Sequence, residues 1–472
     1  MLAMPKPRLP HLALVFFLAL DAAPLAGAAE IGDPFASRAL HAARPGDSVA
    51  GTLRAACRGA VTGAALSLAE VVDYALCNSP QTRLAWANAR SQAAQVGLAE
   101  GAYLPSLSAS LSRSRNDSNA IGPQSSSQQT LGTLSASYLL YDFGGRDASL
   151  ENARELMRAL AATQDASLQA VFSATVQAYY QWYTAEAAVI AAKESERASL
   201  ESLKAAQARL RIGSGTPAER LQAQTAASQA SLSRIQSEGA AKTALGTLAN
   251  AMGLDAHEAP PLQPPPQASP DDRVAGNIAE LIAEAKRLRP ELIAAEAQVG
   301  AARASVGAAQ AAGMPSLSLF ASRNYSAGGP SAETRSTAIG VALDIPLFTG
   351  FNSTYRVRAA EAQVEARLAQ RDQVARQVSL DVWRAYFALV TGIEAVRASA
   401  DLLASAEQSE SVAAGRYRAG VGGILDLLNA QSALASARQQ QIQTLYNWRI
   451  AKTALGLAMG QLDFAQLAAP AK

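Results

Sequence analysis

Cysteine and histidine are scarce in this sequence. Among 472 residues there are two cysteines and three histidines, His11, His41 and His257. A structural zinc site needs about four such ligands close together, so we expect no metal and no other cofactor. The two cysteines, Cys57 and Cys77, favour a disulfide if the chain is exported, and two unpaired thiols are the alternative.

Charge and aromatic side chains are also sparse. Charged residues make up 17% of the chain and aromatic residues 6%, and the net charge of +2 includes no basic tract. A nucleic-acid partner is therefore not expected, because such a partner requires a concentrated basic surface or stacked aromatic rings. Phosphate-binding glycine loops, nucleophile elbows and paired-carboxylate sites are missing too, which argues against an enzyme.

Long apolar runs are confined to the N-terminus. Lys6 and Arg8 precede the apolar run from Leu12 to Leu20, and small residues follow at 26–28. This arrangement predicts a secretory signal peptide over 1–28. No later run reaches the roughly 18 apolar residues of a membrane-spanning helix, so we expect any membrane-spanning part of the mature chain to consist of strands.

The most informative positive feature is an internal duplication. "YLPSLSAS" from Tyr103 returns as "GMPSLSLF" from Gly313, and "KTALG" from Lys242 returns unchanged at Lys452. The offset is about 210 residues throughout, which indicates a whole domain repeated in tandem. The predicted divisions are a signal peptide (1–28), an N-terminal periplasmic segment (29–67), a first repeat (68–258), a Pro-rich linker (259–276), a second repeat (277–460) and a C-terminal tail (461–472).

Each repeat is predicted to contain a helix, two strands, a very long helix, a Gly-rich turn and a last helix. The first helices cover about 68–101 and 278–312. The long helix from about 146 to 212 has roughly 66 residues and a length near 100 Å. Two flanking helices placed end to end match that length, which predicts a paired wall of one continuous and one composite helix. Apolar and aromatic residues at three- and four-residue steps are interpreted as packing residues; they include Leu168, Val171, Phe172, Tyr179, Trp182, Tyr183, Val189, Ile190, Val378, Val382, Tyr386 and Phe387.

The strands alternate between an apolar and a small or polar face. The residues expected to face lipid are Leu107, Leu111, Ile339, Val341 and Leu343, whereas Ser108 and Ser110 are expected to face the lumen. An ordinary sheet packed on a core has the same alternation, but helices of about 100 Å offer no such core. Since small barrels need about eight strands, four strands per chain require several chains, and three chains would supply about twelve.

The sequence resembles the TolC-like outer membrane factor family in three features. These are the duplicated plan, the junctions "YDFGGR" and "LFTGF", and the two RxxxG turns. The resemblance implies a mainly α protein with transmembrane β structure. Four strands per chain would complete a trimeric 12-stranded outer-membrane barrel, and a long periplasmic α-helical barrel would continue it. The implied location is the bacterial outer membrane, extending into the periplasm.

The resemblance also implies partners. They are two further copies in a homotrimer, a periplasmic adaptor (membrane fusion protein), an inner-membrane ABC transporter, the exported protein cargo and outer-membrane lipid. The helix "ALCNSPQTRLAWA" and the missing lipid-anchor cysteine favour type I secretion of a large protein, with an adenylate cyclase-haemolysin toxin of the RTX type as the expected cargo. The outer-membrane channel of a multidrug efflux pump is the alternative.

The Gly-rich turns are the expected site of gating. "IGSGTPAER" has the form of a capping box, in which Thr216 caps a helix and Glu219 reaches back. In the family the periplasmic tips close the duct and carboxylates line the constriction, which the resemblance assigns here to Tyr417, Asp426, Asn429 and Glu219. Two departures are that Gly422 stands where the family often has an arginine and that Asn429 replaces a carboxylate. The turns expected to contact the adaptor include Arg209, Gly213, Gly215, Arg416, Gly420 and Gly422.

Overall fold

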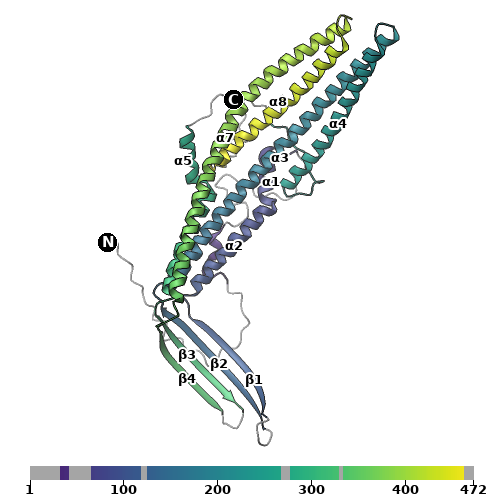
Figure 1. Ribbon diagram of the computed structural model, residues 1–472. Coiled ribbons are helices and arrows are strands. Elements are labelled where there is room, and N and C mark those ends of the chain that lie inside the picture. Colours follow the sequence, from purple (N-terminus) through teal and green to yellow (C-terminus); the bar gives the residue numbers. More distant parts are fainter. Residues whose placement is uncertain are drawn as a thin grey trace.

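The computed structural model describes residues 32–41, 65–118, 125–266, 270, 277–328 and 333–461. Long helices rise from one end of a curved four-stranded sheet (Figure 1). The elements of the first half are the short 3₁₀ helix η2 (Ser37–Leu40), α1 (Leu68–Asn78), α2 (Pro80–Gly101), β1 (Ser106–Ser118), β2 (Ser125–Tyr141), α3 (Gly145–Arg211) and α4 (Pro217–Ala251). Those of the second half are α5 (Ile278–Leu288), α6 (Pro290–Ala311), β3 (Ser316–Ala327), β4 (Thr334–Asp344), α7 (Asn352–Arg418) and α8 (Ile424–Ala458).

The two halves have helices of identical length. In the first half, α1 to α4 contain 11, 22, 67 and 35 residues. In the second half, α5 to α8 contain the same 11, 22, 67 and 35 residues. The tandem duplication inferred from the sequence is therefore confirmed at the level of the fold.

The prediction of one unbroken helix before each strand pair was wrong. The segment over 68–101 is divided between α1 and α2 at Ser79, and its counterpart over 278–312 is divided between α5 and α6 at Arg289. Ser79 (ψ 131°) and Arg289 (ψ 120°) both have extended backbones. Each precedes a proline, whose ring clashes with a helical conformation of the residue before it, so each helix ends and a new one begins.

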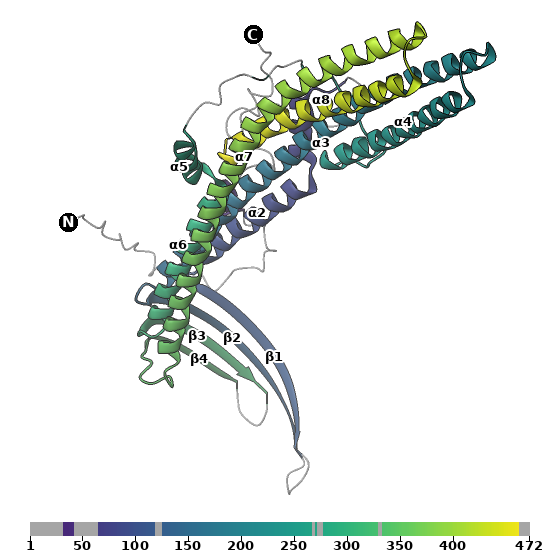
Figure 2. The ribbon, with the colours of Figure 1, turned by 45° about the horizontal axis from the view of Figure 1, so that its top comes forward.

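The helices form a layer in which α3 and α7 run the whole length. At 1.5 Å per residue each is about 100 Å long. Next to the sheet, α2 packs on α3, and α6 lies between α3 and α7; farther away, α4 packs on α3, and α8 lies between α3 and α7 (Figure 2). This confirms the predicted pairing of continuous and composite helices. None of the helices in the described ranges carries an apolar stretch of the length and character that spans a bilayer.

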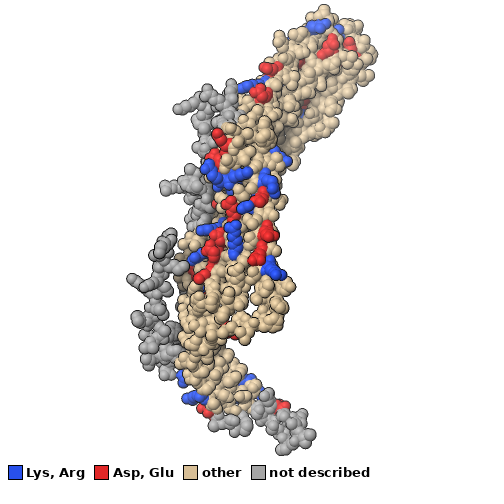
Figure 3. All heavy atoms as spheres, turned by 60° about the vertical axis from the view of Figure 1, so that its left-hand side comes forward, with Lys and Arg blue, Asp and Glu red and all other residues tan. Residues whose placement is uncertain are grey.

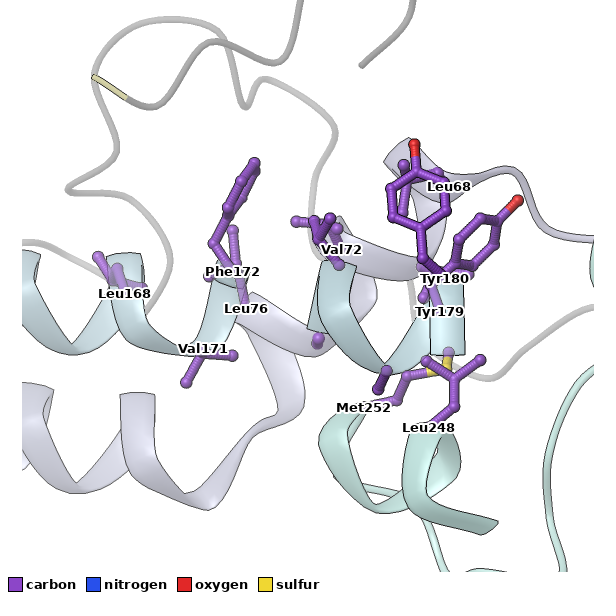
Figure 4. Close-up of a cluster of buried hydrophobic side chains, with 14 of the residues drawn as sticks. Leu68, Val72, Leu76, Leu168, Val171, Phe172, Tyr179, Tyr180, Leu248 and Met252 are labelled. Carbon is purple, nitrogen blue, oxygen red and sulfur yellow. The ribbon is translucent and has the colours of Figure 1, made fainter. Parts of the chain in front are cut away.

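The largest apolar core lies where α1 and the end of α4 meet the middle of α3 (Figure 4). Its buried members include Leu76, Leu168, Phe172, Tyr179 and Met252. Part of the linker is tied to this core: the Tyr179 hydroxyl donates to the Gln263 carbonyl over 2.7 Å, and Arg449 donates to the Pro266 carbonyl over 2.8 Å. The predicted packing role of Leu168, Val171, Phe172, Tyr179 and Tyr183 is thereby confirmed.

Two residues predicted to pack are exposed in the single chain. Ile190 is 58% exposed and Phe387 is 43% exposed. Helical periodicity predicts which residues share a face, but it does not say which neighbouring helix covers that face. Phe387 lies on α7 at one edge of the layer, whereas Ile190 lies on α3, which has neighbours on both sides.

The sheet is antiparallel with the order β1-β2-β3-β4. Its register brings most of the large apolar residues of the strands onto one face, since Leu107 pairs with Ala136, Ala136 with Ala321, and Ala321 with Ile339. Leu131, Leu139 and Phe320 lie on the opposite face. Leu107, Leu111, Ile339, Val341 and Leu343 are each at least 60% exposed. On the surface drawn in Figure 3, charged side chains line the helical part, whereas a largely uncharged zone lies below them.

The opposite face of the sheet carries hydroxyl groups. The Ser108 and Ser135 hydroxyls are hydrogen-bonded across β1 and β2 at 2.7 Å, and Ser106 and Ser137 pair in the same way at 3.3 Å. The strands therefore have one apolar and one hydroxyl-rich surface, as their alternation predicts. That the apolar surface meets lipid stays a prediction at this point.

Some predictions fall on residues outside the described ranges. These are the signal peptide over 1–28, Cys57, most of the N-terminal segment (29–67), part of the Pro-rich linker (259–276) and all but the first residue of the C-terminal tail (461–472). Cys77, near the end of α1, is disulfide-bonded, and its pairing with Cys57 stays a prediction.

Candidate functional site at the helical hairpin tips

The two helical hairpins, α3–α4 and α7–α8, end in turns of the same construction at the end of the molecule farthest from the sheet (Figure 1). In the first turn the Arg209 carbonyl accepts from the amides of Ser214 (3.0 Å) and Gly215 (3.1 Å). In the second turn the Arg416 carbonyl accepts from the amides of Val421 (3.0 Å) and Gly422 (3.1 Å). Each helix end is thus closed by hydrogen bonds to its last free carbonyls.

Glycine is required at two positions of each turn. Gly213 and Gly420 have φ values of 77° and 80°, in the left-handed region that residues with a side chain rarely adopt. A Cβ atom at Gly422 would lie 3.0 Å from the Arg416 Cβ and 3.1 Å from the Tyr417 nitrogen. A side chain at position 422 would therefore crowd the end of α7, and glycine avoids this contact.

Glu219 is engaged in the capping box that the sequence predicts. The Thr216 amide donates to Glu219 Oε2 over 3.1 Å, and the Glu219 amide donates to Thr216 Oγ1 over 3.2 Å. The carboxylate is held against the start of α4 instead of extending freely. Glu219 therefore has a complete structural role, and its contribution to a constriction remains a prediction.

The start of α8 is built differently. Its N-cap is Gly423, which supplies no side-chain hydrogen bond to the helix. Asp426 and Asn429 are both exposed, and their spacing of three places them on one side of the helix. Asp426 thus presents a carboxylate at the tip of the second hairpin, and a carboxylate at this end of a helix is stabilised by the helix dipole.

Tyr417 is buried between the two hairpins and is only 2% exposed. Its surroundings come from the other three helices of the hairpins: Ala206 on α3, Ala223 on α4, and Ile424 and Leu427 on α8. Burial raises the pKa of the Tyr417 hydroxyl, and the positive charge of Arg209 acts in the opposite direction. The hydroxyl oxygen has no hydrogen-bond partner in the described structure. Tyr417 is therefore held by packing and by contacts to its ring and backbone.

Arg209 fastens the two hairpins together. Its guanidinium carbon lies 4.8 Å from the centre of the Tyr417 ring, and Nη1 donates to the Tyr417 carbonyl over 3.2 Å. Nη2 donates to the Ser214 carbonyl over 3.4 Å. We call this group of Arg209, Ser214 and Tyr417 the tip clasp. A cation over an aromatic ring, with little solvent access, makes a contact stronger than one at an open surface.

Polar contacts continue along the seam between α3 and α8. Ser202 and Gln431 are hydrogen-bonded at 3.0 Å, and Arg438 pairs with Glu194 at 3.0 Å. Sequence reasoning missed these pairs as well as the contact between Arg209 and Tyr417, because the partners lie more than 200 residues apart. The available signal was the matching position of Arg209 and Arg416 in the two repeats, which indicates that the turns are equivalent but not which residues touch.

The described residues contain no group of three or more His, Cys, Asp or Glu side chains that could hold a metal ion. The tips instead offer backbone turns, one exposed carboxylate and a buried clasp. Such an arrangement can hold two hairpins together or release them, and it can present charge to a passing solute.

Comparisons with known proteins agree on one group. A family model described as outer membrane efflux protein matches residues 71–254 and 281–461. Protein CyaE of Bordetella pertussis is 34% identical over 404 residues, which cover 84% of each chain. Alkaline protease secretion protein AprF of Pseudomonas aeruginosa is 25% identical over 419 residues, which cover 85% of this chain and 86% of that protein. Among solved structures, the Campylobacter jejuni CmeC outer membrane channel superposes with a TM-score of 0.76 at 20% identity, covering 83% of this chain and 85% of that one.

Proposed function

Because the chain belongs to the outer membrane efflux protein family, we propose that it is the outer-membrane duct of a type I system that secretes a large protein. The protein is an outer-membrane channel of efflux and secretion systems and is not an enzyme. It extends into the periplasm. The type of cargo and the mechanism of opening are the parts that we propose.

The duct is proposed to be a homotrimer. One chain supplies four strands in an open sheet, too few to close a barrel, whereas three chains supply about twelve. The apolar faces would then meet lipid, and the hydroxyl faces would line the lumen. The helical layer also has two open edges, because the described contacts of α7 are with α5, α6 and α8 and do not extend to α2 or α4. Three such layers can close edge to edge around one axis.

The observation that carries the proposed gating is the tip clasp. It joins the two hairpins near their ends, and Asp426 is exposed at the start of α8, where threefold symmetry would present it as a ring. A periplasmic adaptor and an inner-membrane ABC transporter would engage the turns and favour the arrangement in which the hairpins move apart. A ring of carboxylates would favour cations at the mouth.

The proposal of protein secretion draws on the relatives. One of them is named as a protease secretion protein, and the relative with 34% identity covers most of both chains. A toxin of the RTX type is the cargo that we propose to test first. The channel of a drug efflux pump is the second candidate, since the matching family is named for efflux.

The duct is tested by purifying the protein in detergent, measuring the mass of the particle and recording conductance in planar bilayers. We expect a conducting trimer. A monomer that does not conduct contradicts the duct.

The cargo is tested by deleting the chain and measuring secreted protein and drug susceptibility in parallel. Loss of one secreted protein with unchanged susceptibility supports type I secretion, and the opposite pattern supports efflux.

A further inference from the structure

The apolar face of the sheet becomes basic toward the β1–β2 and β3–β4 hairpin ends. On β1 the basic residues Arg113 and Arg115 follow Leu111 on that face. On β3 and β4 the same face carries Arg323, in the row of Ala109, and Arg335, in the row of Leu111. The register fixes this assignment, because directly paired residues share a face. Leu111 pairs with Gly132, Gly132 with Tyr325, and Tyr325 with Arg335.

Two of these arginines form a close pair. Arg323 is opposite Thr337, and Arg335 is opposite Tyr325, two positions farther along each strand. Diagonal neighbours of this kind have backbones about 7–8 Å apart, so two long guanidinium side chains can reach one anion between them. The Arg335 guanidinium also lies 5.7 Å from the centre of the Tyr325 ring.

Carboxylates balance only part of this charge. Arg115 is paired with Asp117 at 3.1 Å, and Arg335 lies 3.6 Å from Glu333, which also accepts a 2.9 Å hydrogen bond from the Tyr325 hydroxyl. Arg113 donates to the Gln128 side chain over 2.9 Å, a neutral partner. In the described part of the chain, four arginines on this face therefore stand against two carboxylates, and threefold symmetry would triple the excess.

The face on which the arginines lie distinguishes ion selection in the lumen from contact with lipid. Arginines that select ions in a channel must point into the lumen. At the same level the described residues of the hydroxyl face are uncharged; they include Ser112, Ser114, Asn324, Ser326 and Ser336. Among the described strand residues the positive charge therefore lies only on the apolar side, around and beyond the level of Leu111.

We propose that Arg113, Arg323 and Arg335 bind the phosphate groups of the glycolipid in the outer leaflet. Guanidinium groups pair with phosphate oxygens through two parallel hydrogen bonds. The acyl chains of the same lipid would lie along Leu107, Leu111 and Ile339. This inference rests on the proposed function, because it takes the apolar face as the one that meets lipid.

The test measures binding of lipid A to the detergent-purified protein by native mass spectrometry. Bisphosphorylated and dephosphorylated lipid A are compared for the wild type, for R323Q/R335Q and for R323K/R335K. Arginines 376 and 384, which are exposed on α7, supply the matched control R376Q/R384Q. With a factor of about five for each basic residue near a charged lipid surface, we expect R323Q/R335Q to bind bisphosphorylated lipid A roughly thirtyfold more weakly. The lysine variant should bind more tightly than R323Q/R335Q but more weakly than the wild type, because it keeps the charge and loses the two parallel hydrogen bonds. The control should match the wild type.

Equal binding of the two lipid A forms by the wild type, or unchanged affinity in R323Q/R335Q, overturns the site. Competition by millimolar inorganic phosphate also overturns it, since it would indicate a free-anion site. Particle mass and bilayer conductance are recorded on the same samples. A conducting trimer without phosphate-dependent lipid binding rejects the lipid site and leaves the duct intact, whereas a wild type that does not conduct rejects the duct.

Discussion

At the scale of single residues, Arg209 combines two roles at one point of the tip. The sequence predicts it as part of a turn that meets the adaptor, and the structure adds a buried contact with Tyr417 on the other hairpin. Asp426, by contrast, is exposed and has no side chain holding it in place at the start of α8. Arg209 is thus suited to hold the tips closed, and Asp426 is suited to act on the ions and solutes that pass.

Replacing Arg209 with alanine should make the closed duct leak. The change removes a cation–π contact and a charged hydrogen bond, together worth about 1–2 kcal/mol. If opening separates the hairpins, the fraction of time spent open should rise about five- to thirtyfold in single-channel recordings. Arg211→Ala, on the exposed side of the same helix end, is the control and should gate normally. Identical open times in the two variants would remove the clasp from the gating mechanism.

Asp426→Asn should reduce the preference of the channel for cations. The substitution keeps the shape of the side chain and removes a charge that a trimer presents three times. The shift in reversal potential under a salt gradient measures the effect, and Asp401→Asn, at an exposed site on α7, is the matched control. An unchanged reversal potential would place Asp426 away from the conduction path.

At the scale of elements, the turns tolerate fewer residue types than the helices that they join. The carbonyls of Arg209 and Arg416 each accept two amide hydrogen bonds, and a Cβ at Gly215 or Gly422 would crowd the preceding helix at 3.1 or 3.0 Å. The turn geometry thus fixes how the α7–α8 tip lies relative to Tyr417. A small change in one turn should therefore alter the clasp.

Gly422→Ala should destabilise the tip by about 1–3 kcal/mol, because the added methyl group would crowd the Arg416 Cβ at 3.0 Å and the Tyr417 nitrogen at 3.1 Å. Gly415→Ala is the control, since nothing lies within 4 Å of its Cβ position and alanine favours a helix. Amide hydrogen exchange at the tip should become faster in the first variant and stay equal or become slower in the second. Unchanged exchange in Gly422→Ala would mean that the turn relaxes at little cost.

At the scale of the whole molecule, the single chain leaves open edges that further copies can cover. Its sheet has two open edges, and α7, against which α5 packs, leaves Leu380, Trp383 and Phe387 exposed on one side. Their spacing of three and four residues forms one apolar stripe. Such a stripe at the edge of a layer is suited to contact the next copy.

Trp383→Ala should weaken the trimer. Trp383 is 49% exposed in the single chain, and covering that surface would contribute about 2 kcal/mol at each interface. The variant should dissociate at a lower temperature or a higher detergent concentration than the wild type, as followed by mass photometry. Ile190→Ala serves as the control, because α3 has neighbours on both sides and does not form an edge. Equal loss of trimer in both variants would argue against α7 as the interface.

The sequence by itself determined the duplication, the length of the long helices, the alternation of the strands and the positions of the turns. These features depend on local periodicity and on glycine and proline, whose conformational limits act within a few residues. Only the tertiary structure decided that four alternating strands align most of their large apolar residues on one face, that arginines lie on that face, and that Arg209 meets Tyr417. Contacts between residues more than 200 positions apart depend on strand register and on the order in which helices pack, and neither is encoded in the spacing of any one segment.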